Sequence, residues 1–193
     1  MYTLSVGLYE QFFAKQDYFV VIIGLDNAGK TTLLEQIKAK FIRDYGMLNP
    51  SKITSTIGMN VGKVEVGQVR LNFWDLGGQE DLRELWGTYY AEASGVIFVV
   101  DGTRRDLFGT VASCFSEAMK SEFVQRIPVL VAVNKSELDG AVSANEVRQL
   151  LSDDEHCSDL AVLPVSALEG HNIDRCVRWL VRSLQQTDRR LEL

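Results

Sequence analysis

Gly24-Leu25-Asp26-Asn27-Ala28-Gly29-Lys30-Thr31 is the stretch that decides the fold, because it has the spacing G-x-x-x-x-G-K-[ST] of a phosphate-binding loop. The apolar, β-branched residues 18–23 precede it and predict a buried strand. After it, residues 32–41 carry apolar side chains at helical spacing, namely Leu33, Leu34, Ile37 and Phe41. The loop is therefore predicted to join the carboxyl end of a strand to a helix N-terminus, where unpaired backbone N–H groups and the helix dipole attract an anion.

Each part of the loop has an expected task. Gly24 and Gly29 let the backbone approach phosphate oxygens closely. Lys30 would place its ammonium on the β- and γ-phosphates, and Thr31 would place its hydroxyl on Mg²⁺. The other residues of this region expected beside the nucleotide are Asp26, Asn27, Ala28 and Thr32. The loop indicates a nucleotide without saying which one, and the alternative is a Gly-rich strand–helix turn that binds nothing.

The composition indicates one globular domain that does not bind nucleic acid. The chain has 193 residues, of which 46% are hydrophobic and 24% are charged. Its net charge of −6 disfavours a broad nucleic-acid-binding surface. Cys114, Cys157 and Cys176 lack C-x-x-C spacing, so we interpret them as reduced thiols of a cytosolic protein. The sequence has no apolar run of the roughly 18 residues that span a membrane, and no secretory signal.

Residues 1–17 are predicted to form an N-terminal amphipathic helix ahead of a single domain, residues 18–193. Apolar residues recur there every four positions, at Leu4, Leu8 and Phe12. Two interpretations stay open: the helix packs on the domain's own core, or it leaves that groove and lies on a membrane surface. The second residue is Tyr2 and not glycine, which excludes N-myristoylation, so a second attachment to the membrane would be needed.

The rest of the chain predicts an α/β fold. Residues 44–58 are polar and read as a loop, and residues 61–73 form a β-hairpin signal around Gly67-Gln68. Helices are predicted over 81–92, 107–123, 144–151 and 173–184, and strands over 95–100, 128–133 and 161–165. This alternation predicts a six-stranded, mostly parallel sheet with one antiparallel edge hairpin and helices on both faces. In such a sheet, ligands bind beyond the carboxyl ends of the strands.

A second motif, Asp75-Leu76-Gly77-Gly78-Gln79, follows the hairpin and fits phosphoryl transfer to water. Asp75 can hold Mg²⁺ through a water, the Gly78 N–H can reach a γ-phosphate, and Gln79 can orient the attacking water. Thr56 would complete the Mg²⁺ shell only while a γ-phosphate is present. Alone, these residues would be an ordinary polar turn and a loop threonine. No arginine nearby is placed for the γ-phosphate, so a finger from an activating protein could accelerate turnover by roughly 10³–10⁵.

Asn134, Lys135 and Glu137 follow a predicted strand and are candidates for reading the base. The amide would pair with a purine edge, the lysine stem would cover the ring, and the carboxylate would accept from guanine N1–H and its 2-amino group. Adenine lacks both donors, so the carboxylate would discriminate. Backbone N–H groups of Ser166 and Ala167 could reach guanine O6. The alternative is a polar turn at a strand end.

These motifs stand in the order and spacing of a known family. The sequence resembles the ADP-ribosylation factor family of small GTPases over essentially the whole chain. The resemblance rests on the loop at 24–31, Thr56-Ile57-Gly58, Trp74-Asp75-Leu76-Gly77-Gly78-Gln79, and Leu85-Trp86 followed by Tyr89-Tyr90. The start Met1-Tyr2-Thr3-Leu4 and the segment 51–54 resemble the branch of the family that works at the trans-Golgi.

The resemblance implies a P-loop NTPase with the small-GTPase fold, which cycles between GDP and GTP forms and hydrolyses GTP slowly with Mg²⁺. It implies a cytosolic monomer that binds the trans-Golgi membrane peripherally in the GTP form through residues 1–17. Its partners would be an exchange factor, a GTPase-activating protein, a Golgi membrane receptor and trafficking effectors. In the family, GTP shifts the hairpin along the sheet and expels the N-terminal helix. An apolar patch of Met59, Trp74 and Tyr89 would respond to the nucleotide and meet effectors.

Two departures and two rival functions accompany the resemblance. Family members usually carry aspartate where this chain has Glu137, and many carry an aromatic residue where it has Met59. The extra methylene of Glu137 moves the carboxylate by about 1.5 Å, which leaves guanine selection open. One rival is a nucleotide-locked scaffold in which Glu137 prevents guanine binding. The other is a small-molecule kinase whose lid would be Arg104-Arg105.

Overall fold

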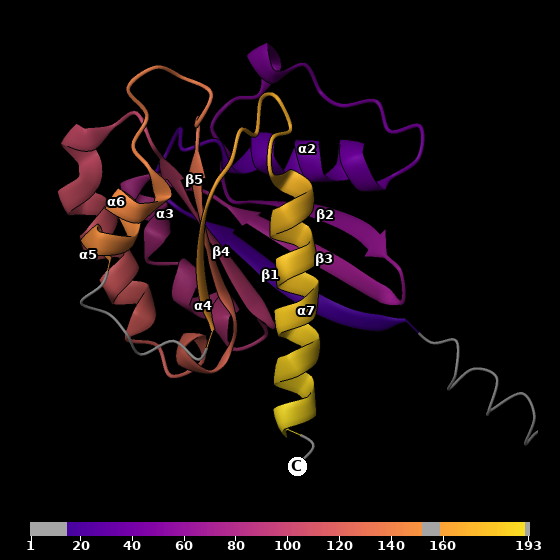
Figure 1. Ribbon diagram of the computed structural model, residues 1–193. Coiled ribbons are helices and arrows are strands. Elements are labelled where there is room, and N and C mark those ends of the chain that lie inside the picture. Colours follow the sequence, from indigo (N-terminus) through magenta and orange to yellow (C-terminus); the bar gives the residue numbers. More distant parts are fainter. Residues whose placement is uncertain (1–14, 152–158, 192–193) are drawn as a thin grey trace, which may run out of the picture.

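The structure, a computed structural model, describes residues 15–151 and 159–191. One six-stranded sheet runs through these residues in the order β2-β3-β1-β4-β5-β6 (Figure 1). The pair β2–β3 is antiparallel and all the other neighbours are parallel. The predicted fold class, a mostly parallel sheet with one antiparallel edge hairpin, is therefore confirmed.

The elements follow the chain in the predicted alternation. The strands are β1 Gln16–Ile23, β2 Met59–Val66, β3 Val69–Leu76, β4 Gly95–Asp101, β5 Val129–Asn134 and β6 Leu160–Pro164. The helices are α2 Lys30–Phe41, α3 Glu80–Arg83, α4 Trp86–Tyr90, α5 Phe108–Met119, α6 Ala144–Leu150 and α7 Ile173–Leu191, with short 3₁₀ turns η1 Pro50–Lys52, η2 Arg105–Leu107 and η3 Val124–Arg126.

Helices cover both faces of the sheet and give it two apolar cores. In Figure 1, α2 and α7 lie on one side and α3 to α6 on the other. One core joins Leu33 of α2 and Leu180 of α7 to the sheet, and the other joins Trp86 of α4 and Phe115 of α5 to its opposite face. All six residues of β5 are buried, as expected for a central parallel strand that is covered on both sides.

The single helix predicted for residues 81–92 is wrong, because two short helices, α3 and α4, stand in its place. Between them, the N–H of residue 85 bonds three residues back at 3.2 Å, and the N–H of residue 88 within α4 does the same at 3.1 Å, in the tighter 3₁₀ geometry. The break lets Trp86 bury its ring and donate its indole N–H to Gly77 O at 2.9 Å. This long-range contact outweighs the local helical periodicity.

Several boundaries also differ from the prediction, among them those of β1, α5 and α7. β1 begins at Gln16, so the last two residues of the predicted N-terminal helix are strand, while residues 1–14 lie outside the described ranges. α5 ends at Met119 instead of residue 123. α7 continues to Leu191, and Asp188 in its last turns accepts a hydrogen bond from the Tyr18 hydroxyl at 2.6 Å. The end of α7 is therefore attached to the start of β1.

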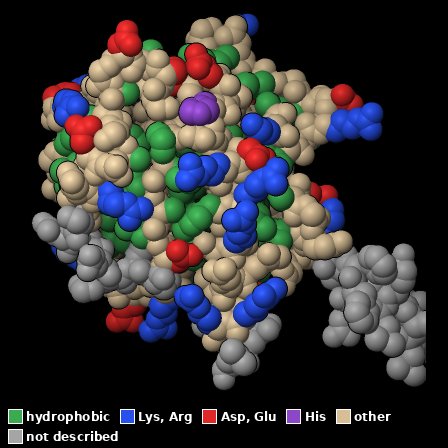
Figure 2. All heavy atoms as spheres, in the orientation of Figure 1, with side chains coloured by type: hydrophobic (Ala, Val, Ile, Leu, Met, Phe, Trp, Pro, Cys, Tyr) green, Lys and Arg blue, Asp and Glu red, His purple; other side chains and the backbone are tan. Residues whose placement is uncertain are grey.

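Positive charge gathers on α7 although the whole chain is acidic. Arg175, Arg178 and Arg182 are exposed and, at spacings of three and four, share one face of the helix. Figure 2 shows Lys and Arg side chains gathered over this part of the surface. In the described part of the chain, no helix is both long enough and apolar enough to cross a membrane.

Glu35 is a buried carboxylate of α2 that ties down the polar loop after the helix. It is 1% exposed and accepts hydrogen bonds from Lys38 Nζ (2.8 Å), the Tyr45 hydroxyl (2.8 Å) and the Leu48 N–H (3.4 Å). Burial alone would raise the pKa of Glu35, but these hydrogen bonds outweigh it and hold the pKa below its ordinary value. Glu35 thus attaches to α2 the start of the segment that carries Thr56.

We expect Glu35→Gln to lower the free energy of unfolding of the GDP-bound protein by about 2 kcal/mol at neutral pH, since charged hydrogen bonds are lost. The folded-state pKa lies below the ordinary 4.5, so this stability is present above pH 4.5 and is lost as pH falls through the folded pKa. Denaturant-induced unfolding measured at several pH values should therefore show that the difference in unfolding free energy between wild type and Glu35→Gln becomes smaller in acid. The control is Glu117→Gln, an exposed partner of Lys120, with an effect below about 0.5 kcal/mol. A pH-independent difference for Glu35→Gln would contradict this account.

Candidate nucleotide-binding site

At two positions of the loop between β1 and α2, the backbone conformation and its close neighbours permit only glycine. Gly24 and Gly29 have φ values of 142° and 91°. An added Cβ would lie 2.2 Å from Val99 O at Gly24 and 2.3 Å from Asn134 Nδ2 at Gly29. Both distances are too short for any side chain, so the loop needs glycine to pack against β4 and β5. The predicted strand–loop–helix geometry is confirmed.

A cavity of about 200 Å³ opens above this loop. Most of its lining was predicted from the sequence: Asp26, Asn27, Gly29, Lys30, Thr31, Thr32, Thr56 and Lys135. The sequence interpretation missed three further lining residues, Ile53, Thr54 and Ser55, which come from the polar loop after α2. The Ser55 hydroxyl donates to Asp26 Oδ2 at 3.3 Å, so this polar loop touches the phosphate-binding loop directly.

Lys30 lies inside the loop with its ammonium on backbone oxygens. Its Nζ donates to Gly24 O at 3.0 Å and to Leu25 O at 2.9 Å, and the side chain is buried. Burial lowers the pKa of Lys30, while the nearby carboxylates of Asp75 and Asp26 act in the opposite direction. The loop therefore holds a desolvated ammonium group, which an anionic ligand would stabilise.

Three oxygens from three different segments meet at the start of α2. The hydroxyls of Thr31 and Thr56 are 2.7 Å apart, and Asp75 Oδ2 accepts from Thr31 at 2.6 Å and from Thr56 at 3.4 Å. Asp75 is fully buried, and its Oδ1 has no hydrogen-bond partner among the described residues. Burial raises the pKa of Asp75, and the hydrogen bonds from Thr31, Thr56 and Asn60 together with the charge of Lys30 oppose that rise. An orphaned carboxylate oxygen beside two hydroxyls is a donor set that fits Mg²⁺.

Gly78 is pressed against the phosphate-binding loop. A Cβ there would lie 2.4 Å from Lys30 Nζ and 2.5 Å from Gly24 O, so only glycine allows this approach. The preceding Gly77 donates its N–H to Gly58 O at 2.9 Å, which joins the segments on both sides of the hairpin. Gln79 follows at the N-terminus of α3 with an exposed side chain.

Sequence reasoning missed two residues that hold this glycine pair. Arg83 Nε donates to Gly78 O at 3.0 Å, and Trp86 Nε1 donates to Gly77 O at 2.9 Å. The available signal was the indole N–H itself, because a buried tryptophan needs a hydrogen-bond acceptor. In the sequence, Trp86 was noted only as part of the Leu85-Trp86 motif.

The base-reading candidates come together at the ends of β5 and β6, but Asn134 does more than predicted. Its Nδ2 donates to Ala28 O at 2.8 Å, and its Oδ1 accepts from the Ala167 N–H at 2.9 Å. Asn134 therefore links the phosphate-binding loop to the loop after β6. One amide hydrogen and one lone pair remain for a purine edge. Lys135 Nζ pairs with Asp101 Oδ2 at 2.5 Å.

The backbone N–H groups of Ser166 and Ala167, which were predicted to reach guanine O6, are not free to do so in this arrangement. The Ser166 N–H bonds to His171 O at 3.2 Å, and the Ala167 N–H is occupied by Asn134, so both already have acceptors. Glu137 differs, because its Oε2 is buried with no hydrogen-bond partner among the described residues. Glu137 is not among the residues that line the cavity above the loop, so its carboxylate must turn before it can meet the donors of guanine.

The predicted apolar patch is present and larger than expected. Met59 and Val61 share a face of β2, and Trp74 pairs with Val61 across the hairpin. The Trp74 ring lies 5.8 Å from that of Tyr89 and 5.1 Å from that of Phe19, measured between centroids. Phe19, Met59 and Val61 are all exposed. The sequence did not indicate Phe19 or Val61, because a residue's neighbours across a sheet depend on strand order.

The carboxyl ends of the strands carry a loop that requires glycine at two positions, a buried lysine and a cluster of three oxygens. This combination defines a small GTPase. Residues 5–184 match the model of the ADP-ribosylation factor family, and the chain belongs to that family. As a member it is a GTP-binding switch that hydrolyses GTP, and members work with exchange factors, activating proteins and effectors.

The relatives agree with this assignment. The chain is 43% identical over 188 residues to ADP-ribosylation factor-related protein 1 of Homo sapiens, covering 94% of this chain and 92% of that protein. It is 34% identical over 190 residues to ADP-ribosylation factor-like protein 3 of Saccharomyces cerevisiae, covering 96% and 95%. Among solved structures, the Arl6 BBS3 small GTPase of Trypanosoma brucei with bound GppNp matches with a TM-score of 0.78 at 29% identity, covering 89% of this chain and 99% of that chain.

We expect Asp75→Asn to weaken Mg²⁺ binding by about 10–100-fold, as the loss of an outer-shell metal partner does. The measurement is release of a fluorescent GDP over a Mg²⁺ titration, with Asp106→Asn on the exposed surface as the control. An unchanged Mg²⁺ dependence in Asp75→Asn would remove Asp75 from the metal site.

The same substitution should raise the melting temperature of the Mg²⁺-free protein. The folded-state pKa of Asp75 lies above 3.8, so the ionised carboxylate costs stability at neutral pH, and this cost disappears below the unfolded pKa. The gain from Asp75→Asn should therefore be largest at neutral pH and vanish in acid. Scanning calorimetry at both pH values checks the sign.

Proposed function

We propose that this chain is a Mg²⁺-dependent GTP switch that regulates membrane traffic at the trans-Golgi. The observation that carries the switch is the contact of Thr56 with Thr31 and Asp75, at 2.7 and 3.4 Å. Thr56 belongs to the polar loop after α2, whereas its partners belong to the phosphate-binding loop and β3. A ligand at this point would control whether the loop stays attached.

The residues divide the chemistry of hydrolysis between them. Lys30 and the N–H groups of the loop bind the phosphates, and the Thr31, Thr56 and Asp75 oxygens would hold Mg²⁺, which offsets charge on the phosphates. The Gly78 N–H, beside Lys30, would bind the γ-phosphate. Gln79 would turn toward the site and orient the attacking water.

We propose that intrinsic hydrolysis is slow, and the positions of the arginines support this. Arg83 in α3 is engaged with Gly78 O and contacts Cys114 Sγ at 3.9 Å, so it faces away from the cavity above the loop. Lys30 and Lys135 are the cationic residues among those that line this cavity in the described chain. An activating protein would therefore supply the missing arginine, as the family relationship leads us to expect.

The kinase alternative has little support in the structure. Its candidate lid residues are held elsewhere, with Arg104 paired to Asp106 at 2.7 Å and Arg105 paired to Glu146 at 2.9 Å. The scaffold alternative depends on Glu137. The Oε2 of Glu137 has no partner among the described residues, so no hydrogen bond of the protein has to break before it accepts from guanine.

We expect the purified protein to bind GTP and GDP at least about a hundredfold more tightly than ATP, because adenine cannot satisfy Glu137. Calorimetric titration with the three nucleotides measures this ratio. Glu137→Asp should keep the guanine preference, and Glu137→Ala should lose most of it. Preference for ATP would favour a kinase, and failure to bind any of the three would favour the scaffold.

The membrane role rests on residues 1–17 and on the relatives named after ADP-ribosylation factors. We propose that this segment attaches the GTP form to the membrane and that a Golgi membrane receptor supplies the second attachment, since one unlipidated helix binds weakly. Cytosolic GDP protein would then return to the trans-Golgi when an exchange factor loads GTP. Exposed Phe19, Met59 and Val61 with Trp74 and Tyr89 would meet trafficking effectors.

We expect protein loaded with a non-hydrolysable GTP analogue to sediment with Golgi membranes several-fold more than GDP-loaded protein. Removing residues 1–14, which leaves β1 complete, should abolish this difference. Leu8→Glu in the full chain should do the same without shortening it, because a buried charge at a membrane is costly. Binding that is equal in both nucleotide forms would refute the coupling.

A further inference from the structure

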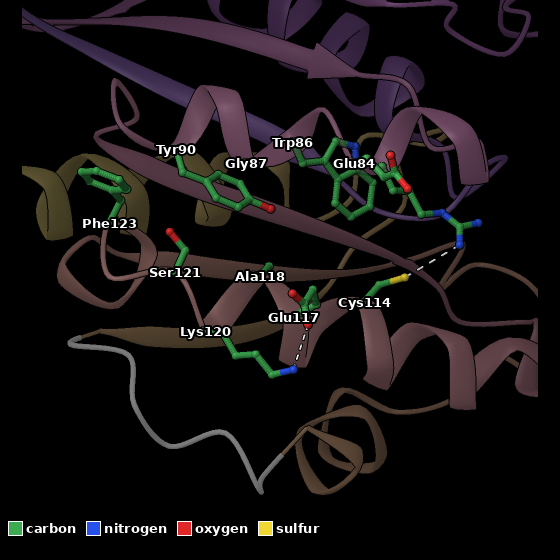
Figure 3. Close-up of a pocket in the computed structure, with 11 residues that line it drawn as sticks. Glu84, Trp86, Gly87, Tyr90, Cys114, Glu117, Ala118, Lys120, Ser121 and Phe123 are labelled. Carbon is green, nitrogen blue, oxygen red and sulfur yellow. Dashed lines mark hydrogen bonds and ion pairs between the residues drawn. The ribbon is translucent and has the colours of Figure 1, made fainter.

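A second cavity, of about 670 Å³, lies away from the nucleotide site, between α4 and the end of α5 (Figure 3). Trp86, Tyr90, Ala118 and Phe123 form its apolar walls, and Cys114 and Glu117 lie on the α5 side. Its volume is within the roughly 300–1,000 Å³ of small-molecule pockets. Nothing in the hydrolysis of GTP uses this space.

The Tyr90 hydroxyl opens into this cavity, although the side chain as a whole is buried. Tyr90 is 6% exposed, and Figure 3 shows its hydroxyl directed into the pocket. No described residue accepts from it within hydrogen-bond distance. Burial raises the pKa of Tyr90 well above its ordinary value, so the hydroxyl is a proton donor at every physiological pH. Because the hydroxyl is accessible from the cavity and uses no acceptor of the described protein, it can donate to a ligand oxygen there in place of solvent.

Arg83 adds a positive charge at the edge of the same cavity. Its guanidinium donates to Gly78 O at 3.0 Å and contacts Cys114 Sγ at 3.9 Å. Within the described ranges it makes no ion pair, so its charge is not neutralised by a carboxylate of the protein. An anionic group in the cavity would supply that partner.

We propose that this cavity is a regulatory site for a small aromatic or alicyclic acid. The apolar ring system would pack between Trp86 and Phe123. A carbonyl or ether oxygen would accept from the Tyr90 hydroxyl, and a carboxylate or sulfonate would pair with Arg83.

Binding in this cavity is coupled to the nucleotide through two hydrogen bonds. Trp86 and Arg83 in its wall donate to the carbonyls of Gly77 and Gly78, and Gly78 lies against the phosphate-binding loop. A ligand that fixes α3 and α4 therefore fixes the peptide that would contact the γ-phosphate. Because the coupling is reciprocal, an occupied cavity changes the affinity for nucleotide, and the bound nucleotide changes the affinity for the ligand.

Two glycines provide a matched test of the site. Gly87 lines the cavity and Gly109 lies outside it in α5, and an added Cβ at either position meets no atom within 4 Å. Gly87→Leu should fill the cavity, while Gly109→Leu makes the same chemical change elsewhere. The probe is 1-anilinonaphthalene-8-sulfonate, a fluorescent aromatic sulfonate, added to the full-length GDP-bound protein.

We expect saturable one-to-one binding to wild type and Gly109→Leu, with affinity reduced at least tenfold in Gly87→Leu. Tyr90→Phe should lose about fivefold, the effect of one hydrogen bond. Bound probe should also protect Cys114 of wild type from alkylation, read by peptide mass spectrometry, which needs no variant. Equal binding to both leucine variants, or alkylation of Cys114 at the same rate with saturating probe, would overturn the site.

The coupling has its own readout in the release rate of fluorescent GDP. Saturating probe should change this rate at least twofold in wild type and Gly109→Leu, and leave it unchanged in Gly87→Leu. An unchanged rate in wild type with probe bound would refute the coupling. Probe binding and Cys114 protection do not depend on the proposed trans-Golgi role. A failure of the cavity proposal can therefore be distinguished from a failure of the proposed function.

Discussion

The nucleotide end of the molecule depends on one buried carboxylate, that of Asp75. It stands at the end of β3, beside the central strand, and collects a hydroxyl from the phosphate-binding loop and another from the polar loop after α2. An ionised carboxylate in such surroundings is unstable unless hydrogen bonds or a cation compensate it. Two threonines compensate it in part, and the remaining oxygen is the one that Mg²⁺ would satisfy. Ligand binding and loop position are therefore linked by electrostatics.

The coupling between ligand binding and loop position is rigid because Gly78 packs closely against the phosphate-binding loop. Gly78 lies close to Lys30 Nζ and Gly24 O, and the carbonyls of Gly78 and Gly77 accept hydrogen bonds from Arg83 and Trp86. A small displacement of α3 or α4 therefore reaches the phosphate-binding loop with little loss, because packed interiors transmit strain. The same two side chains form part of the second cavity. The hydrolytic site and the proposed regulatory site thus share one wall.

The sequence predicted those features that depend on neighbouring residues. The loop at 24–31, the apolar strands and the edge hairpin all have local patterns, and the structure confirms them. Features that depend on distant contacts were missed or wrong. The break between α3 and α4 comes from Trp86 reaching Gly77, and Asn134 links two loops that lie 106 and 33 residues away. Glu35, placed in a helix by periodicity, gains its role only from Tyr45 and Leu48.

The direction of β1 sets the geometry that any surface-bound form of the protein must adopt. Its first two residues, Gln16 and Asp17, are the last two of the segment 1–17 that is proposed to rest on lipid, and its last, Ile23, leads into the phosphate-binding loop. Eight extended residues span about 26 Å, so one rigid strand separates these two points. With the near end anchored, the opening for GTP would lie at most about this distance farther from the bilayer than the anchor. Soluble proteins could then approach it from the cytosol without competing with the headgroups for space.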